Sequence, residues 1–192
     1  GVTTTPINFF ITTITGFTLG LSVLIAKNFG AKKQENIPPV LAVFAVILGG
    51  VFLLIAAGGS ALSYPFMALL HTPSDTIGLA GSYIRIIFLG LPFLAVYNVY
   101  TATLRGLGDS RIPFLSILLS SIVNVLLDIL FVAEFRWGVQ GAATATVLSQ
   151  ATMTVFIVIY GTRKYRWLKS GYRKENFCAS IVREGVRFGL PP

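Results

Sequence analysis

Long stretches without a charged side chain dominate this sequence. Five of them contain no Asp, Glu, Lys or Arg: 2–26, 37–74, 86–104, 112–127 and 137–162. A helix needs about 20 mostly apolar residues to cross the hydrocarbon core of a bilayer. The pattern therefore predicts five transmembrane helices, at 6–27, 38–60, 83–104, 112–133 and 139–161. The predicted fold class is an all-α membrane protein, a polytopic helix bundle that contacts the lipid bilayer.

Basic residues gather on one side of the predicted bundle. Thirteen of the fifteen Lys and Arg residues follow the first, third or fifth span, and these connections lie on the same side. Cytoplasmic loops are enriched in Lys and Arg, so this side is predicted to be cytoplasmic and the bilayer to be the cell's inner (plasma) membrane. The net charge of +8 is explained by this topology and predicts no nucleic-acid partner. We expect a five-helix bundle at 1–162 and a basic cytoplasmic linker at 163–192.

Polar residues spaced by four form one stripe on the fourth predicted span and a second on the fifth. A carboxylate at membrane depth is unfavourable unless it is paired, so Asp128 is a candidate functional group. From the helical rise, Asp128, Asn124 and Thr146 lie about 8, 2 and 5 Å outward of the midpoints of their spans, in one layer. Their oxygens can hold Na⁺, or Asp128 can bind H⁺. The stripes comprise Ser116, Ser120, Asn124 and Asp128, then Thr146, Gln150 and Thr154.

A purely structural role is the alternative for these residues, in which Asp128 pairs with a Ser or Asn and holds two helices together. Ser116, Ser120, Gln150, Tyr97 and Asn98 are candidates for lining a cavity that binds substrate. No His, Cys and carboxylate set has the spacing of metal ligands beyond a possible Na⁺ site, and no cofactor is expected.

Enzyme activity is not expected, because no catalytic groups are paired in the sequence. The segment from Gly106 to Asp109 matches the GxGD string of intramembrane aspartyl proteases, a chemistry that needs a second, facing aspartate. Asp109 lies between Arg105 and Arg111, so helix capping or ion pairing is the better interpretation.

Three segments resemble the multidrug and toxic compound extrusion (MATE) transporters. They are Phe29-Gly30-Ala31-Lys32-Lys33; Leu104-Arg105-Gly106-Leu107-Gly108-Asp109-Ser110-Arg111-Ile112-Pro113; and Asn124-Val125-Leu126-Leu127-Asp128 followed by Gly138-Val139-Gln140-Gly141-Ala142-Ala143-Thr144-Ala145-Thr146. Their order and spacing agree over nearly the whole chain. The resemblance implies twelve helices in two six-helix lobes. This chain would supply helices two to six of the N-terminal lobe, and its partners would be helix one and the C-terminal lobe of the same protein.

The resemblance also implies a function. Family members export cationic or amphipathic compounds in exchange for Na⁺ or H⁺, the coupling ion. The positions of the family's N-lobe cation site match Asp128, Asn124, Thr146 and the carbonyl of Ala142, and a family asparagine matches Asn98. The family's helix-one aspartate has no match here. Two alternatives stay open: a lipid-intermediate flippase of the same wider fold group, and a non-transporting membrane scaffold.

Overall fold

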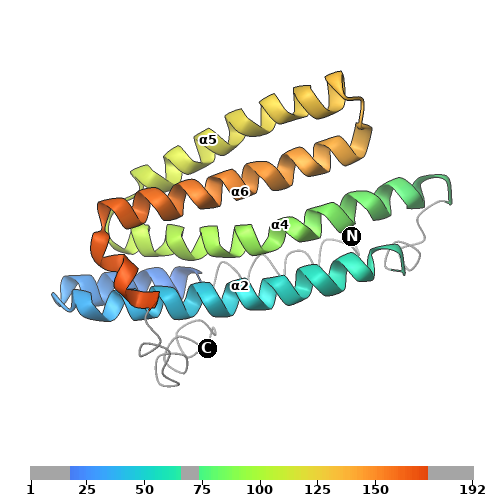
Figure 1. The fold of residues 1–192 in the computed structure, drawn as a ribbon. Coiled ribbons are helices and arrows are strands. Elements are labelled where there is room, and N and C mark those ends of the chain that lie inside the picture. Colours follow the sequence, from blue (N-terminus) through green and yellow to red (C-terminus); the bar gives the residue numbers. More distant parts are fainter. Residues whose placement is uncertain (1–17, 66–73, 173–192) are drawn as a thin grey trace. The chain divides into compact units, whose positions relative to one another are not determined.

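The described part of the chain is helical throughout apart from short turns. A computed structural model describes residues 18–65 and 74–172, and no strand occurs among them (Figure 1). After a helix at 18–30 come η1 (Gln34–Asn36), α2 (Ile37–Ala61), α4 (Ser74–Gly106), α5 (Arg111–Asp128), η2 (Ile129–Glu134), α6 (Gly138–Lys164) and η3 (Arg166–Tyr172). The predicted all-α fold class is confirmed.

Four of the described helical segments are long and apolar enough to cross a membrane. They are Gln34–Ala61, Ile77–Gly106, Arg111–Glu134 and Gly138–Lys164, which correspond to the second to fifth predicted spans. The first predicted span, 6–27, lies largely outside the described residues, although 18–30 is helical.

The third of the five predicted spans begins earlier than expected. Its predicted start was residue 83, next to Arg85, whereas α4 already begins at Ser74. A single arginine does not end a helix, because its long apolar stem lets the charged group extend towards the polar boundary. Pro92 does not end it either, and the helix continues to Gly106.

Two compact units divide the chain, and the boundary between them crosses the long helices. Unit 1 contains residues 1–46, 98–113 and 159–192, and unit 2 contains 47–97 and 114–158. The expected boundary at 162/163 stays a prediction: α6 continues to Lys164, η3 follows it, and 173–192 lie outside the described residues.

Unit 1 has a dense apolar core. Its fully buried large side chains come from the helix at 18–30, the start of α2, the end of α4 and the segment after α6; they include Leu21, Ile25, Leu41, Leu104 and Leu168. The 18–30 helix and α4 pack closely because Gly106 has no side chain. A Cβ at Gly106 would lie 2.7 Å from the carbonyl oxygen of Ser22.

Unit 2 is held together by glycine contacts and by hydrogen bonds between helices. The ring of Phe88 in α4 occupies the space where a Cβ of Gly59 in α2 would lie. The hydroxyl of Thr154 in α6 donates to the carbonyl oxygen of Phe93 in α4, at 2.8 Å. Such a bond satisfies a polar group inside an apolar layer, where water is excluded.

Most of the α5 surface is apolar and exposed. Large apolar side chains at least one third exposed include Phe114, Ile117, Leu118, Ile122, Val125 and Leu126. This surface is suited to lipid or to further apolar helices, as the predicted membrane location requires.

Candidate functional site

Asp128 and Asn124 carry buried polar atoms that have no hydrogen-bond partner among the described residues. These atoms are the carboxylate Oδ1 of Asp128 and the amide Nδ2 of Asn124. The two residues are four apart on α5, so they lie on one helical face on successive turns. Both side chains are half-buried. A buried polar atom without a partner is unfavourable by about 1–3 kcal/mol, which makes this face a place where a ligand would be stabilised.

Two contacts fix how α5 and α6 lie against each other within unit 2. The hydroxyl of Ser120 on α5 donates to the carbonyl oxygen of Ser149 on α6, at 3.0 Å. At the other end of the hairpin, a Cβ added at Gly141 would lie 3.1 Å from the backbone of Phe131. The helices run side by side and antiparallel in Figure 1. The register of the two polar stripes can therefore be worked out.

The register brings the four candidate cation-site residues to matching levels. From Ser120, four residues forward along α5 correspond to four residues back along α6. Counted from this contact, Asn124 is one residue from the level of Thr146 and Asp128 is one residue from the level of Ala142; counted from Phe131 and Gly141, each pair is two residues apart in level. One residue of an α-helix is about 1.5 Å along the axis. That these residues bind a cation stays a prediction.

Thr146 and Ala142 are joined to each other. The Thr146 hydroxyl donates to the Ala142 carbonyl oxygen, at 2.9 Å, in the four-residue pattern common for Thr inside helices. Because the hydroxyl proton is used in this bond, the lone pairs of the Thr146 oxygen remain available to accept. Oxygen acceptors are what Na⁺ requires of its ligands; the Thr146 oxygen can still accept, whereas the Ala142 carbonyl oxygen already accepts this hydrogen bond.

The candidate cavity-lining residues are distributed over both units. In unit 2, Ser116 and Tyr97 are buried, and Ser120 bonds to Ser149. Gln150 lies against α4, because a Cβ at Gly90 would overlap its Oε1 atom. Asn98 is half-buried and belongs to unit 1.

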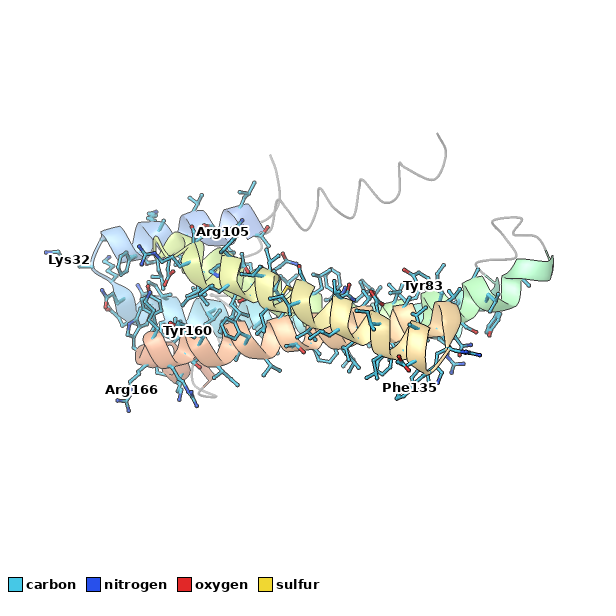
Figure 2. All side chains as sticks on the ribbon, turned by 90° about the horizontal axis from the view of Figure 1, so that it is seen from above. Lys32, Tyr83, Arg105, Phe135, Tyr160 and Arg166 are labelled. Atoms are coloured by element: carbon cyan, nitrogen blue, oxygen red, sulfur yellow. The ribbon has the colours of Figure 1, made fainter. Side chains whose placement is uncertain are left out.

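A π-helical segment begins directly after Asp128. This is η2, and the sequence analysis did not predict it. Segments of this kind are rare and often lie at functional sites. The ring of Trp137 stacks on that of Phe131 with centroids 5.0 Å apart, and Phe135 contacts both. Phe135 lies at the end of the hairpin (Figure 2). Three aromatic residues within seven positions are the sequence signal from which a packed turn could have been predicted.

The turn after η2 is tight. Arg136 and Gly138 both have positive φ, 54° and 55°. Glycine adopts this backbone region readily, whereas for arginine it is strained.

Asp109 caps one helix and forms an ion pair, which confirms the interpretation preferred over a protease aspartate. Its Oδ1 accepts a hydrogen bond from the backbone N–H of Arg111, at 3.1 Å. Its Oδ2 lies 2.5 Å from the Lys164 ammonium group and accepts a hydrogen bond from the Tyr165 hydroxyl, at 3.2 Å. The sequence suggested the neighbouring arginines; the cationic partner is instead 55 residues away.

The electrostatics of this cluster favour an ionised Asp109. Burial by itself would raise the pKa of the Asp109 carboxyl. The hydrogen bond and charge of Lys164, together with the backbone N–H groups of Ile112 and Arg111, outweigh burial and hold the pKa below its usual value. For Tyr165, burial and the adjacent Asp109 charge raise the pKa of the hydroxyl, so it stays a donor.

No metal centre of the usual kind is present in the described ranges. No group of three or more His, Cys, Asp or Glu side chains there could hold a metal ion. Fold and site together define a class: a multi-pass α-helical membrane protein with a carboxylate and an amide on successive turns of one span.

Comparisons with known proteins place the chain more narrowly. The family model MatE matches residues 1–130. The probable multidrug resistance protein YoeA of Bacillus subtilis is 36% identical over 169 residues, which cover 83% of this chain and 36% of YoeA. The chain belongs to the MATE family, whose members are transporters and not enzymes.

A more distant relative and a solved structure agree with this assignment. The multidrug export protein MepA of Staphylococcus aureus is 26% identical over 178 residues, covering 91% of this chain and 39% of MepA. A structure titled as the inward-facing conformation of a multidrug resistance MATE family transporter of the MOP superfamily matches with a TM-score of 0.82 and 26% identity. That match covers 94% of this chain and 41% of the transporter. The chain thus spans well under half the length of these relatives.

Proposed function

We propose that this chain forms part of a secondary-active multidrug exporter and carries its cation-coupling site. The exported compounds are cationic or amphipathic, and export is driven by H⁺ or Na⁺ moving inward. Asp128 is the group that binds the coupling cation, and Asn124, Thr146 and the Ala142 carbonyl complete the site. Further helices of a longer protein, including a second lobe, supply the rest of the transport path.

The unpartnered Oδ1 of Asp128 carries this proposal. A carboxylate oxygen buried in a membrane span without a hydrogen bond gains most from binding a proton or a Na⁺ ion, because either one neutralises it. The nearby acceptors favour the same conclusion. Thr146 Oγ1 and Ala142 O are joined at 2.9 Å, and the contacts of the hairpin put them within one or two residues of the levels of Asn124 and Asp128.

Coupling follows from the change in charge. Cation binding neutralises a carboxylate whose Oδ1 has no hydrogen-bond partner among the described residues, which alters the stability of a hydrated site relative to a closed one. A ligand shifts a conformational equilibrium only by its difference in affinity for the two states. Asp128 supplies that difference for the cation, while Asn98, Ser116, Ser120, Gln150 and Tyr97 line the substrate path. The protein lies in the plasma membrane with its basic loops in the cytoplasm.

The decisive variant is Asp128→Asn in the full-length protein that contains this chain. The assay is efflux of a cationic dye from cells at matched expression, with external Na⁺ and pH varied separately. We expect coupled export to be lost, because the amide cannot take up a proton or neutralise Na⁺. The cation whose gradient drives wild-type export is the coupling ion.

Glu134→Gln is the matched control, because it removes one negative charge from an exposed position six residues further along. It should retain export. Unchanged export in Asp128→Asn would refute the coupling role. A wild-type protein that moves a lipid intermediate and no dye would favour the flippase alternative. A wild-type protein with no transport of either compound would favour the scaffold.

A further inference from the structure

The segment that follows α6 has one docked face and one charged face. Tyr165 and Leu168 are joined by a backbone hydrogen bond, Leu168 N–H to Tyr165 O at 2.9 Å, and Leu168 is fully buried. Arg166 and Lys169 are exposed and belong to η3, a 3-10 helix. Side chains three residues apart eclipse each other in a 3-10 helix, so these two cations lie on one side.

Contacts within unit 1 hold this segment in place. Leu168 is inserted in the core, and the Tyr165 hydroxyl donates to the buried carboxylate of Asp109, at 3.2 Å. The ring of Trp167 meets that of Tyr165 edge to face, with centroids 6.1 Å apart. The backbone that carries the exposed cations is therefore held by packing before any ligand arrives. Preorganisation of this kind lowers the entropy lost on binding.

The exposed cations of this segment have no carboxylate nearby within the described part of the chain. The one ion pair found there joins Asp109 to Lys164, which leaves Arg163, Arg166 and Lys169 unneutralised. Five further exposed cations belong to the same unit, whose described acids are Glu35 and Asp109: Lys27, Lys32, Lys33, Arg105 and Arg111. In Figure 2, Lys32 and Arg166 both point outward from the helices. The unit thus presents a strongly cationic surface.

The segment begins where the membrane span ends. The fourth described span, long and apolar enough to cross a membrane, finishes at Lys164, and Tyr165 and Trp167 follow directly after it. Tyr and Trp are enriched at the depth of the lipid headgroups because their rings suit the apolar side and their polar groups suit water. Trp167 is half-buried, so part of its ring stays available for contact.

We propose that η3 is a binding site for the headgroup of an anionic phospholipid. Arg166 and Lys169 contact the phosphate, Trp167 lies beside the glycerol region, and Asp109, Tyr165 and Leu168 position the segment. Arginine suits this role because its planar group binds two phosphate oxygens at once. The site depends on the membrane location of α6 and not on the transport activity proposed above.

Trp167 allows a direct test, because the chain has only two tryptophans, Trp137 and Trp167. Trp137→Phe keeps an aromatic ring beside Phe131 and leaves Trp167 as the single tryptophan of these 192 residues; tryptophans elsewhere in the longer protein are replaced by phenylalanine, so that Trp167 is the single reporter. The full-length protein that contains this chain, in bilayers of phosphatidylcholine, is titrated with brominated phosphatidylglycerol or brominated phosphatidylcholine, which quench tryptophan on contact. We expect brominated phosphatidylglycerol to quench at several-fold lower mole fraction. Retention of phosphatidylglycerol after detergent extraction, measured by native mass spectrometry on the unaltered chain, gives a second reading.

Two paired variants distinguish a site from a general surface charge. Arg166→Gln with Lys169→Gln should weaken the preference by about fivefold for each cation removed at low salt. Lys32→Gln with Lys33→Gln removes the same charge from another exposed loop of unit 1 and should change it little. The proposal would be overturned if both double variants lost the preference for phosphatidylglycerol equally, or if the protein without these substitutions showed no such preference.

Competition with inorganic phosphate distinguishes a site for the whole lipid from a site for phosphate alone. At constant ionic strength, added phosphate should not displace phosphatidylglycerol, because it lacks the glycerol and acyl parts that lie beside Trp167. Displacement at millimolar phosphate would show a phosphate site and would rule out the lipid assignment.

Discussion

Gly106 is the position where one added methyl group should have the largest effect on the stability of unit 1. A Cβ there would lie 2.7 Å from the Ser22 carbonyl oxygen, 2.8 Å from Ile25 Cβ and 2.9 Å from Ile25 Cγ2. All three distances are shorter than van der Waals contact, and none of these atoms is the free end of a flexible side chain. The 18–30 helix and α4 would have to separate by a few tenths of an ångström.

The expected magnitude follows from two opposing effects. Overpacking of a well-packed interface lowers the free energy of unfolding by about 1–3 kcal/mol. Replacing a helical glycine by alanine raises it by about 0.5–1 kcal/mol, and by less at the last residue of a helix. Gly106→Ala should therefore destabilise the protein by roughly 1–2 kcal/mol.

Gly50→Ala is the matched control. Gly50 lies inside α2, and a Cβ there would meet nothing within 4 Å. This variant should be stabilised by about 0.5–1 kcal/mol, from helix propensity alone. The assay is unfolding of the purified chain in mixed micelles with increasing dodecyl sulfate, followed by far-ultraviolet circular dichroism.

The short distance between Gly106 and Ile25 leads to a second test. In a double-mutant cycle with Ile25→Ala, the Gly106→Ala penalty should fall, because Cγ2 of Ile25 is then absent. The packing argument would be refuted if Gly106→Ala were as stable as Gly50→Ala. It would also be refuted if the changes in unfolding free energy of Gly106→Ala and Ile25→Ala simply added in the double mutant.

Two further predictions concern the connections between helices. Asp109→Asn keeps a cap for Arg111 N–H but removes the ion pair with half-exposed Lys164, so we expect a loss of about 1 kcal/mol at neutral pH. Because the pKa of the Asp109 carboxyl in the folded protein is lower than its usual value, this stability is present above the pKa of the unfolded chain and is lost as the pH falls through the folded pKa. Unfolding measured at pH 7 and pH 3 should show the mutant and wild type converging in acid. Separately, Arg136→Gly should relieve the strain at φ 54° and raise the unfolding free energy by about 1 kcal/mol, less the backbone entropy of glycine; a clear loss of stability would contradict it.

The sequence predicts the spans well because length and charge are local properties. The charge-free stretches identified α2, α5 and α6 to within a few residues, and the short connection between α5 and α6 required them to be antiparallel neighbours. The same reasoning misplaced the start of α4. A segment without charged residues indicates where a helix is stable in lipid. Arg85 ends such a segment, but the helix continues through it.

The contacts between helices were less predictable. Spacing by four placed Asn124 and Asp128 on one face, and the structure leaves one polar atom of each without a partner. Nothing in the spacing indicated that Ser120 bonds to the backbone of Ser149, because periodicity defines a face and not the register of the neighbouring helix. The partner of Asp109 was missed for the same reason. Which lysine meets an aspartate 55 residues away depends on how helices pack.

The two contacts of the α5–α6 hairpin have a mechanical consequence. The Ser120–Ser149 bond and the Phe131–Gly141 approach are separated by 11 residues along the first helix, or roughly 16 Å. Sliding one helix past the other by a full turn, about 5.4 Å, would break both attachments together. These two contacts therefore oppose sliding of α5 against α6, so Asn124, Asp128 and Thr146 keep their spacing within the hairpin. Under the coupling role proposed for Asp128, motion that changes its access to water is expected to come from the elements around the hairpin.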